Sequence, residues 1–96
     1  MSETLTRLLD ALADGHQLQD AEFAAFSDLD RVDVAAVKDR WPGLEVSTRA
    51  LLLERANELA DVSLDLNFRA LGTLALDDPD PGVRAEAARA AKGRRR

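Results

Sequence analysis

The sequence contains no cysteine and only one histidine, His16, in 96 residues. The lack of cysteine excludes a disulfide framework, a thiolate zinc site and a cysteine nucleophile. The single histidine excludes histidine-rich metal sites and any mechanism that needs two histidines. No apolar run approaches the roughly 20 residues of a membrane helix, and the N-terminus lacks the basic start and apolar core of a signal peptide. We therefore expect a cytoplasmic protein.

Signatures of catalysis and of metal binding are also missing. The chain has no glycine-rich phosphate loop, no H-E-x-x-H, no G-x-S-x-G and no dinucleotide-binding fingerprint. The acidic groups at 28–33 and 77–80 do not fit a calcium loop, which needs a central glycine and a closing glutamate. Helix capping explains both groups, because anions favour helix N-termini. His16, beside Gly15, is expected in a solvated loop, so we expect no catalytic residue, cofactor or metal, and no enzyme.

Charge is distributed unevenly along the chain, although the formal net charge is only −5. Residues 1–80 hold seven basic and seventeen acidic side chains, near −10. Residues 81–96 hold six basic and one acidic side chain, near +5. Asymmetry of this kind bears on partners and solubility rather than on fold.

Apolar residues recur at helical spacing, without alternation, and this pattern predicts an all-α fold. Six stripes are expected to face the core: Leu5, Leu8, Leu9 and Leu12; Phe23 and Phe26; Val34, Val37 and Trp41; Leu52, Leu53, Ala56, Leu59 and Ala60; Leu64, Phe68, Leu71 and Ala75; and Val83, Ala87, Ala90 and Ala91. The aromatic residues at these positions are expected to be packing residues rather than a ligand box. The solvent side of the fourth helix is expected to carry Arg49, Glu54, Arg55 and Glu58.

Capping residues predict where these helices begin and end. The expected starts are at Ser2, Asp20, Asp30, Ser47 and Asp80, and the expected breaks are at Gly15, Pro42-Gly43, Asp61–Ser63 and residues 77–82. A hydrophobic staple is expected between Val46 and Leu51. Pro81 suits a first helical position, where its missing N–H costs nothing. Gly72 lies inside a helix at a cost of about 1 kcal/mol relative to alanine, which indicates that another helix crosses closely there.

The segment 74–90, LALDDPDPGVRAEAARA, resembles a HEAT repeat of the bacterial, phycobilisome-lyase type. The matching positions are Asp78, Asp80, Pro81, Val83, Arg84, Ala87 and Ala90. In that family the D-x-D-P turn joins the two antiparallel helices of one repeat. The resemblance implies a short α-α superhelix, a HEAT-like solenoid of about six antiparallel helices. It also implies that Arg84 takes part in arginine–aspartate contacts, with Asp78 or Asp80 as the acceptor.

The resemblance also suggests how the chain is organised. We expect a single helical domain over 1–92, followed by a basic tail over 93–96. Within the domain, residues 1–26 would be capping helices, 27–62 a divergent helical pair and 65–92 the well-matched repeat. HEAT repeats run about 40–47 residues and at least three are usual. The chain is therefore expected to be a short form or an N-terminal fragment of a longer repeat protein.

The last helix and the tail are the expected partner-binding surface. In a solenoid, the small apolar outer side of this helix would meet the next repeat. The residues expected to bind another protein are Arg84, Ala85, Ala88, Arg89, Lys92, Arg94, Arg95 and Arg96. The groove between the fourth and sixth helices is the second expected surface. A small accessory subunit or adaptor fits this pattern, and self-association is its closest variant.

The basic tail leaves three interpretations open. It could neutralise RNA or DNA phosphates, but it lacks interleaved aromatic residues, and the acidic chain, with a pI near 4.7, would repel a nucleic acid strand. It could meet an acidic protein surface, including a second copy of the chain. It could also be a solvated charge run that suits a helix C-terminus. A protein partner and a solvated tail explain it equally well, and nucleic acid ranks behind them.

Overall fold

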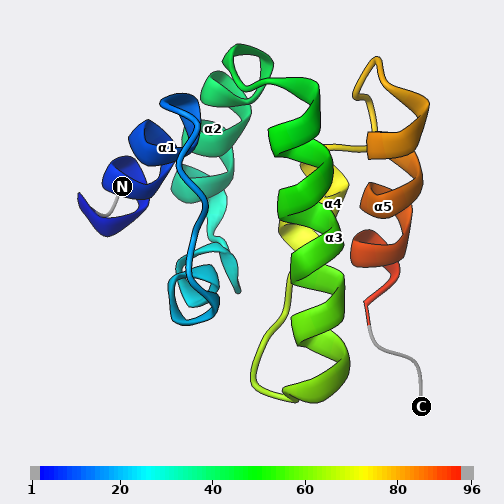
Figure 1. Ribbon diagram of the computed structural model, residues 1–96. Coiled ribbons are helices and arrows are strands. Elements are labelled where there is room, and N and C mark those ends of the chain that lie inside the picture. Colours follow the sequence, from blue (N-terminus) through cyan, green and yellow to red (C-terminus); the bar gives the residue numbers. More distant parts are fainter. Residues whose placement is uncertain (1–2, 94–96) are drawn as a thin grey trace.

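The computed structural model describes residues 3–93, so the expected cap at Ser2 and the tail arginines Arg94, Arg95 and Arg96 lie outside it. The described chain is all-α and contains no strand within 3–93 (Figure 1). Its elements are α1 (Glu3–Ala13), η1 (Asp20–Phe26), α2 (Arg31–Arg40), η2 (Trp41–Gly43), α3 (Val46–Val62), α4 (Arg69–Leu74) and α5 (Pro81–Lys92), where η marks a 3₁₀ helix.

Several local signals at the first three helical segments are confirmed, but Asp20 is the first residue of its segment and Gln19 is the residue that caps it. All four leucines of the first stripe are buried along α1, and Gly15 follows with a φ of 87°, which glycine adopts without strain. Asp30 caps α2, because its Oδ1 accepts a hydrogen bond from the Asp33 N–H at 2.8 Å. Phe23 and Phe26 are buried on η1, which is a 3₁₀ helix.

The start of α3 differs from the sequence prediction. The helix begins at Val46 with Glu45 as the residue before it, and Ser47 lies inside the first turn, so Ser47 is not the cap. Val46 and Leu51 are 45% and 54% exposed, so the expected staple is wrong as a core contact. Leu44, the residue that follows η2, is buried instead, at 3% exposure.

The end of α3 also differs. The helix continues through Val62, and an irregular segment over 63–68 replaces the expected tight break. Leu64 is 69% exposed and does not belong to the core. The reason lies at Asn67. Its backbone N–H donates to the Ser27 hydroxyl at 2.8 Å, and its side-chain oxygen accepts from the Arg69 N–H at 3.0 Å. Because of these contacts, α4 begins only at residue 69.

The close crossing expected at Gly72 is confirmed. A Cβ atom at this position would lie 2.4 Å from the backbone nitrogen of Ala91 and 2.7 Å from both the Ala87 carbonyl and the Ala90 Cβ. Only a residue without a side chain therefore allows α4 to approach α5 this closely. α5 packs against both α4 and α3. The chain runs along α3, returns through α4 and reverses again into α5 (Figure 1).

Candidate interaction surfaces

The outer face of α5 gathers five of the residues expected to bind a partner. Val83, Ala87 and Ala90 point into the core, with exposures of 0%, 0% and 4%. The opposite side of the helix is exposed and carries Arg84, Ala85, Ala88, Arg89 and Lys92. We call these five residues the α5 face. The arginines at 94–96 lie outside the described residues.

The α5 helix is held in place by polar contacts as well as by its apolar side. The Asn57 side chain on α3 donates to the Glu86 carbonyl at 3.1 Å and to its carboxylate at 2.9 Å. Asp80 caps the helix as expected, since its Oδ2 accepts from the Val83 N–H at 2.9 Å, and Pro81 occupies the first helical position. The α5 face is therefore presented on a fixed helix.

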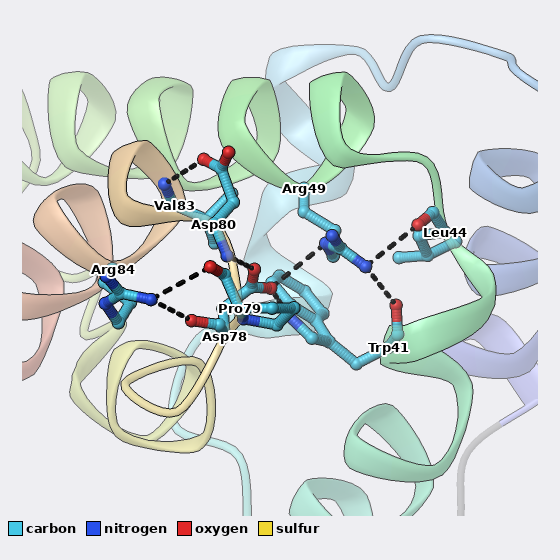
Figure 2. A network of polar contacts seen from close by, with 8 residues as sticks. All are labelled: Trp41, Leu44, Arg49, Asp78, Pro79, Asp80, Val83 and Arg84. Carbon is cyan, nitrogen blue, oxygen red and sulfur yellow. Dashed lines mark hydrogen bonds and ion pairs between the residues drawn. The ribbon is translucent and has the colours of Figure 1, made fainter.

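Arg84 donates hydrogen bonds to the turn before α5. Its Nη1 donates to the backbone carbonyls of Asp78 at 2.9 Å and Pro79 at 3.0 Å (Figure 2). The contact that the resemblance implied for Arg84 thus involves the main-chain oxygen of Asp78 rather than its carboxylate. At the α5 face, a partner would compete with these carbonyls for the guanidinium.

A buried ionic network beneath this turn was not predicted from the sequence. Asp78 is 4% exposed, and its Oδ2 accepts from the Trp41 indole N–H at 2.8 Å and lies 3.0 Å from Arg49 Nε (Figure 2). Its other oxygen accepts from the Asp80 N–H at 2.9 Å. Asp78 was expected to serve a helix end, and this expectation is wrong because its carboxylate joins η2 and α3 to the α4–α5 turn. Trp41, which is 6% exposed, is a packing residue as expected.

Arg49 was expected on the solvent side of α3, and this prediction is also wrong. The residue is 8% exposed, and its Nη1 donates to the Leu44 carbonyl at 3.1 Å. A signal was present in the sequence, because Arg49 precedes Leu52, Leu53 and Ala56 at helical spacing and therefore continues their buried stripe. An arginine in such a stripe indicates a carboxylate partner in the core.

A groove opens where the C-terminal ends of α3 and α5 meet the 63–68 segment. It has a volume of about 860 Å³. Its cations are Arg69, Arg89 and Lys92, its anion is Asp61, and its apolar lining includes Ala60, Leu64, Leu66, Phe68 and Ala90. We call it the end groove. It coincides with the second surface expected from the sequence, and Arg89 and Lys92 make it continuous with the α5 face.

A second groove, of about 490 Å³, lies between the 15–20 loop and the N-terminal half of α3. We call it the side groove. Arg55 spans it, with its guanidinium 2.6 Å from the Asp20 carboxylate and 2.8 Å from that of Glu58. The hydrogen bond from Arg55 holds the pKa of Asp20 below its ordinary value, and the two carboxylates raise the pKa of Arg55. His16 is exposed in the same groove, as expected for a loop residue.

The described residues contain neither a candidate metal site nor a membrane-spanning helix. Within 3–93, no three histidine, aspartate or glutamate side chains form a group that could hold a metal ion. None of the helices in this range combines the length and the apolar character that a membrane crossing requires.

Comparisons with known proteins identify no relative. No protein-family model, no curated protein and no solved structure matches the chain. The two grooves and the α5 face are therefore the features of the molecule that indicate a function.

Proposed function

We propose that this chain is a non-catalytic protein-interaction module, a small accessory subunit or adaptor that docks a partner protein through the α5 face and the end groove. The observation that carries the proposal is the composition of this surface. A fixed helix presents two exposed alanines beside exposed cations, and an 860 Å³ groove with apolar lining continues it. Small residues allow close approach of another backbone, and the cations favour a partner that is acidic at the contact.

The finer fold assignment belongs to the same proposal. We infer that α4, the 75–80 turn and α5 form one HEAT-like repeat of a short solenoid in a cytoplasmic bacterial protein. The Asp80 cap, the Pro81 start and the close approach at Gly72 support this inference. In solenoids each repeat contacts its neighbours, and terminal repeats normally carry a polar outer face. Ala85 and Ala88 depart from such a polar face, which is consistent with a covered surface.

The decisive experiment compares two alanine-to-glutamate variants. Ala88→Glu places a bulky anion in the middle of the α5 face, whereas Ala35→Glu makes the same change at an exposed position of α2. Tagged wild type and both variants are used for affinity capture, with quantitative mass spectrometry of the bound proteins. A central contact is worth more than about tenfold in affinity, so we expect Ala88→Glu to lose its partner and Ala35→Glu to retain it.

Two results would count against the proposal. Equal capture by both variants would remove the α5 face from the interaction, and the absence of any enriched partner would remove the hetero-complex itself. Enrichment of RNA or DNA in place of protein, lost steeply with added salt, would favour the electrostatic nucleic acid alternative.

A further inference from the structure

The two grooves lie on opposite sides of α3 and carry opposite charge. α3 stands between α1 and α5, with the 15–20 loop on one side and α5 on the other (Figure 1). Arg55 and Glu58 line the side groove, whereas Asn57 and Asp61 line the end groove. One helix thus separates two surfaces of complementary chemistry.

The side groove has a negative surplus. Arg55 is shared by the carboxylates of Asp20 and Glu58, so this group of three carries a net charge near −1. Glu54 is exposed in the same groove and brings the total near −2, with His16 counted as neutral. The lining also includes Leu51, which is 54% exposed although it lies beside buried Leu52. A cationic segment with aliphatic stems suits this combination.

The end groove has the opposite surplus. Arg69, Arg89 and Lys92 outweigh Asp61, for a net charge near +2. The ion pair between Arg89 and Glu86 spans 3.3 Å with the arginine side chain 62% exposed. Exposed pairs of this kind contribute little and exchange easily. Arg89 can therefore turn to a carboxylate of another molecule at small cost.

We propose that the basic end of α5 of one copy docks in the side groove of a second copy, so that the chain associates head to tail. This inference rests on the proposed function and names the partner as the chain itself. Lys92 and Arg89 meet Glu54 and Glu58, and their aliphatic stems cover Leu51. Because the donor and acceptor surfaces differ, the interface is heterologous, and it extends into short linear chains unless the rotation closes a ring.

Complementary charge reversals test this arrangement. The first variant, Glu54→Lys/Glu58→Lys, removes the acceptor surface, and the second, Arg89→Glu/Lys92→Glu, removes the donor surface. Two controls make the same changes at exposed residues outside both grooves: Asp39→Lys/Asp77→Lys and Arg7→Glu/Arg31→Glu. Circular dichroism establishes that each protein is folded, and sedimentation velocity at low salt gives its mass over a range of concentrations.

We expect the wild type and both controls to form concentration-dependent oligomers that dissociate as salt is added. Each reversed variant should associate at least about tenfold more weakly, because an attractive pair becomes a repulsive one. Mixing the two reversed variants should restore association, because the intact donor of one meets the intact acceptor of the other and the reversed donor, now acidic, meets the reversed acceptor, now basic. Association that appears on mixing, and that neither variant shows alone, identifies the two surfaces as binding partners.

A wild type that stays monomeric up to about 1 mM, a concentration at which even a weak contact would populate oligomers, would overturn self-association. A mixture of the reversed variants that stays monomeric would also overturn it. The proposed function fails separately, through the Ala88→Glu comparison. Glu54→Lys/Glu58→Lys could still capture a foreign partner as wild type does, with no self-association detected. That result would exclude only the second copy as the partner of the basic end of α5.

Discussion

Replacing Asp78 with alanine is expected to destabilise the protein by about 3–5 kcal/mol. Removing one partner of a buried ion pair costs this much because the other charge is left buried and uncompensated. Arg49 would keep only its carbonyl contacts, at 3.1 Å to Leu44 and 3.5 Å to Trp41. The Trp41 indole N–H would also lose its acceptor, which lies at 2.8 Å. A domain of this size is stable by only about 5–15 kcal/mol, so the variant should be marginally folded.

Asparagine at position 78 should cost less than alanine. The carboxylate accepts on both oxygens, from the Trp41 indole N–H on one and from the Asp80 N–H on the other, and it forms an ion pair with Arg49. An amide can accept on one side only, so the loss of a charge-assisted contact predicts about 1.5–3 kcal/mol. Asp77→Ala is the matched control, because Asp77 is the exposed neighbour and should change stability by less than about 0.5 kcal/mol.

Urea denaturation followed by tryptophan fluorescence and far-ultraviolet circular dichroism measures these changes. Trp41 is the only tryptophan and donates directly to Asp78, so its emission reports on the network. Arg49→Met and the double variant with Asp78→Ala complete a cycle, in which a coupling of at least about 1 kcal/mol is expected for residues in contact. A loss below about 1 kcal/mol for Asp78→Ala, or strict additivity in the cycle, would refute the proposed importance of the network.

Two further outcomes follow from the packing and the surface charges. Gly72→Ala should destabilise the protein by about 1–3 kcal/mol through overpacking, because a Cβ there would lie 2.4 Å from the α5 backbone. This loss is expected although alanine favours helix formation. Thermal melting measures it, and an unchanged or raised Tm would contradict it. The Asp20 carboxyl should titrate below its ordinary pKa by NMR and should move back up in Arg55→Met. The Asp20–Arg55 pair contributes its full stability above the unfolded-state pKa of Asp20. This contribution is lost as the pH falls through the lowered folded-state pKa of Asp20. An Asp20 titration that Arg55→Met leaves unchanged would refute the assignment.

Features encoded within a few neighbouring residues could be predicted from the sequence. Asp30 and Asp80 cap helices because a carboxylate two or three residues before an N–H reaches it without help from the rest of the fold. Gly72 could be assigned to a close crossing because a glycine inside a helix is costly without such a reason.

The long-range network and the grooves could not be predicted in the same way. Trp41 and Asp78 are 37 residues apart in sequence, and only the packing of η2 beneath the α4–α5 turn brings them together. Leu64 seemed to continue an apolar stripe, but the contacts at Asn67 set the start of α4 after it. The grooves depend on the paths of the 15–20 and 63–68 segments, which local spacing does not specify.

The central claim, that the outer face of α5 is covered by another protein, is tested most directly by a photo-crosslinking residue placed at position 88. The same residue at position 35 is the control, since both replace exposed alanines on helices. We expect illumination in cells to produce a discrete protein adduct from position 88 and none from position 35. The same adducts from both positions, or none from position 88, would contradict the account.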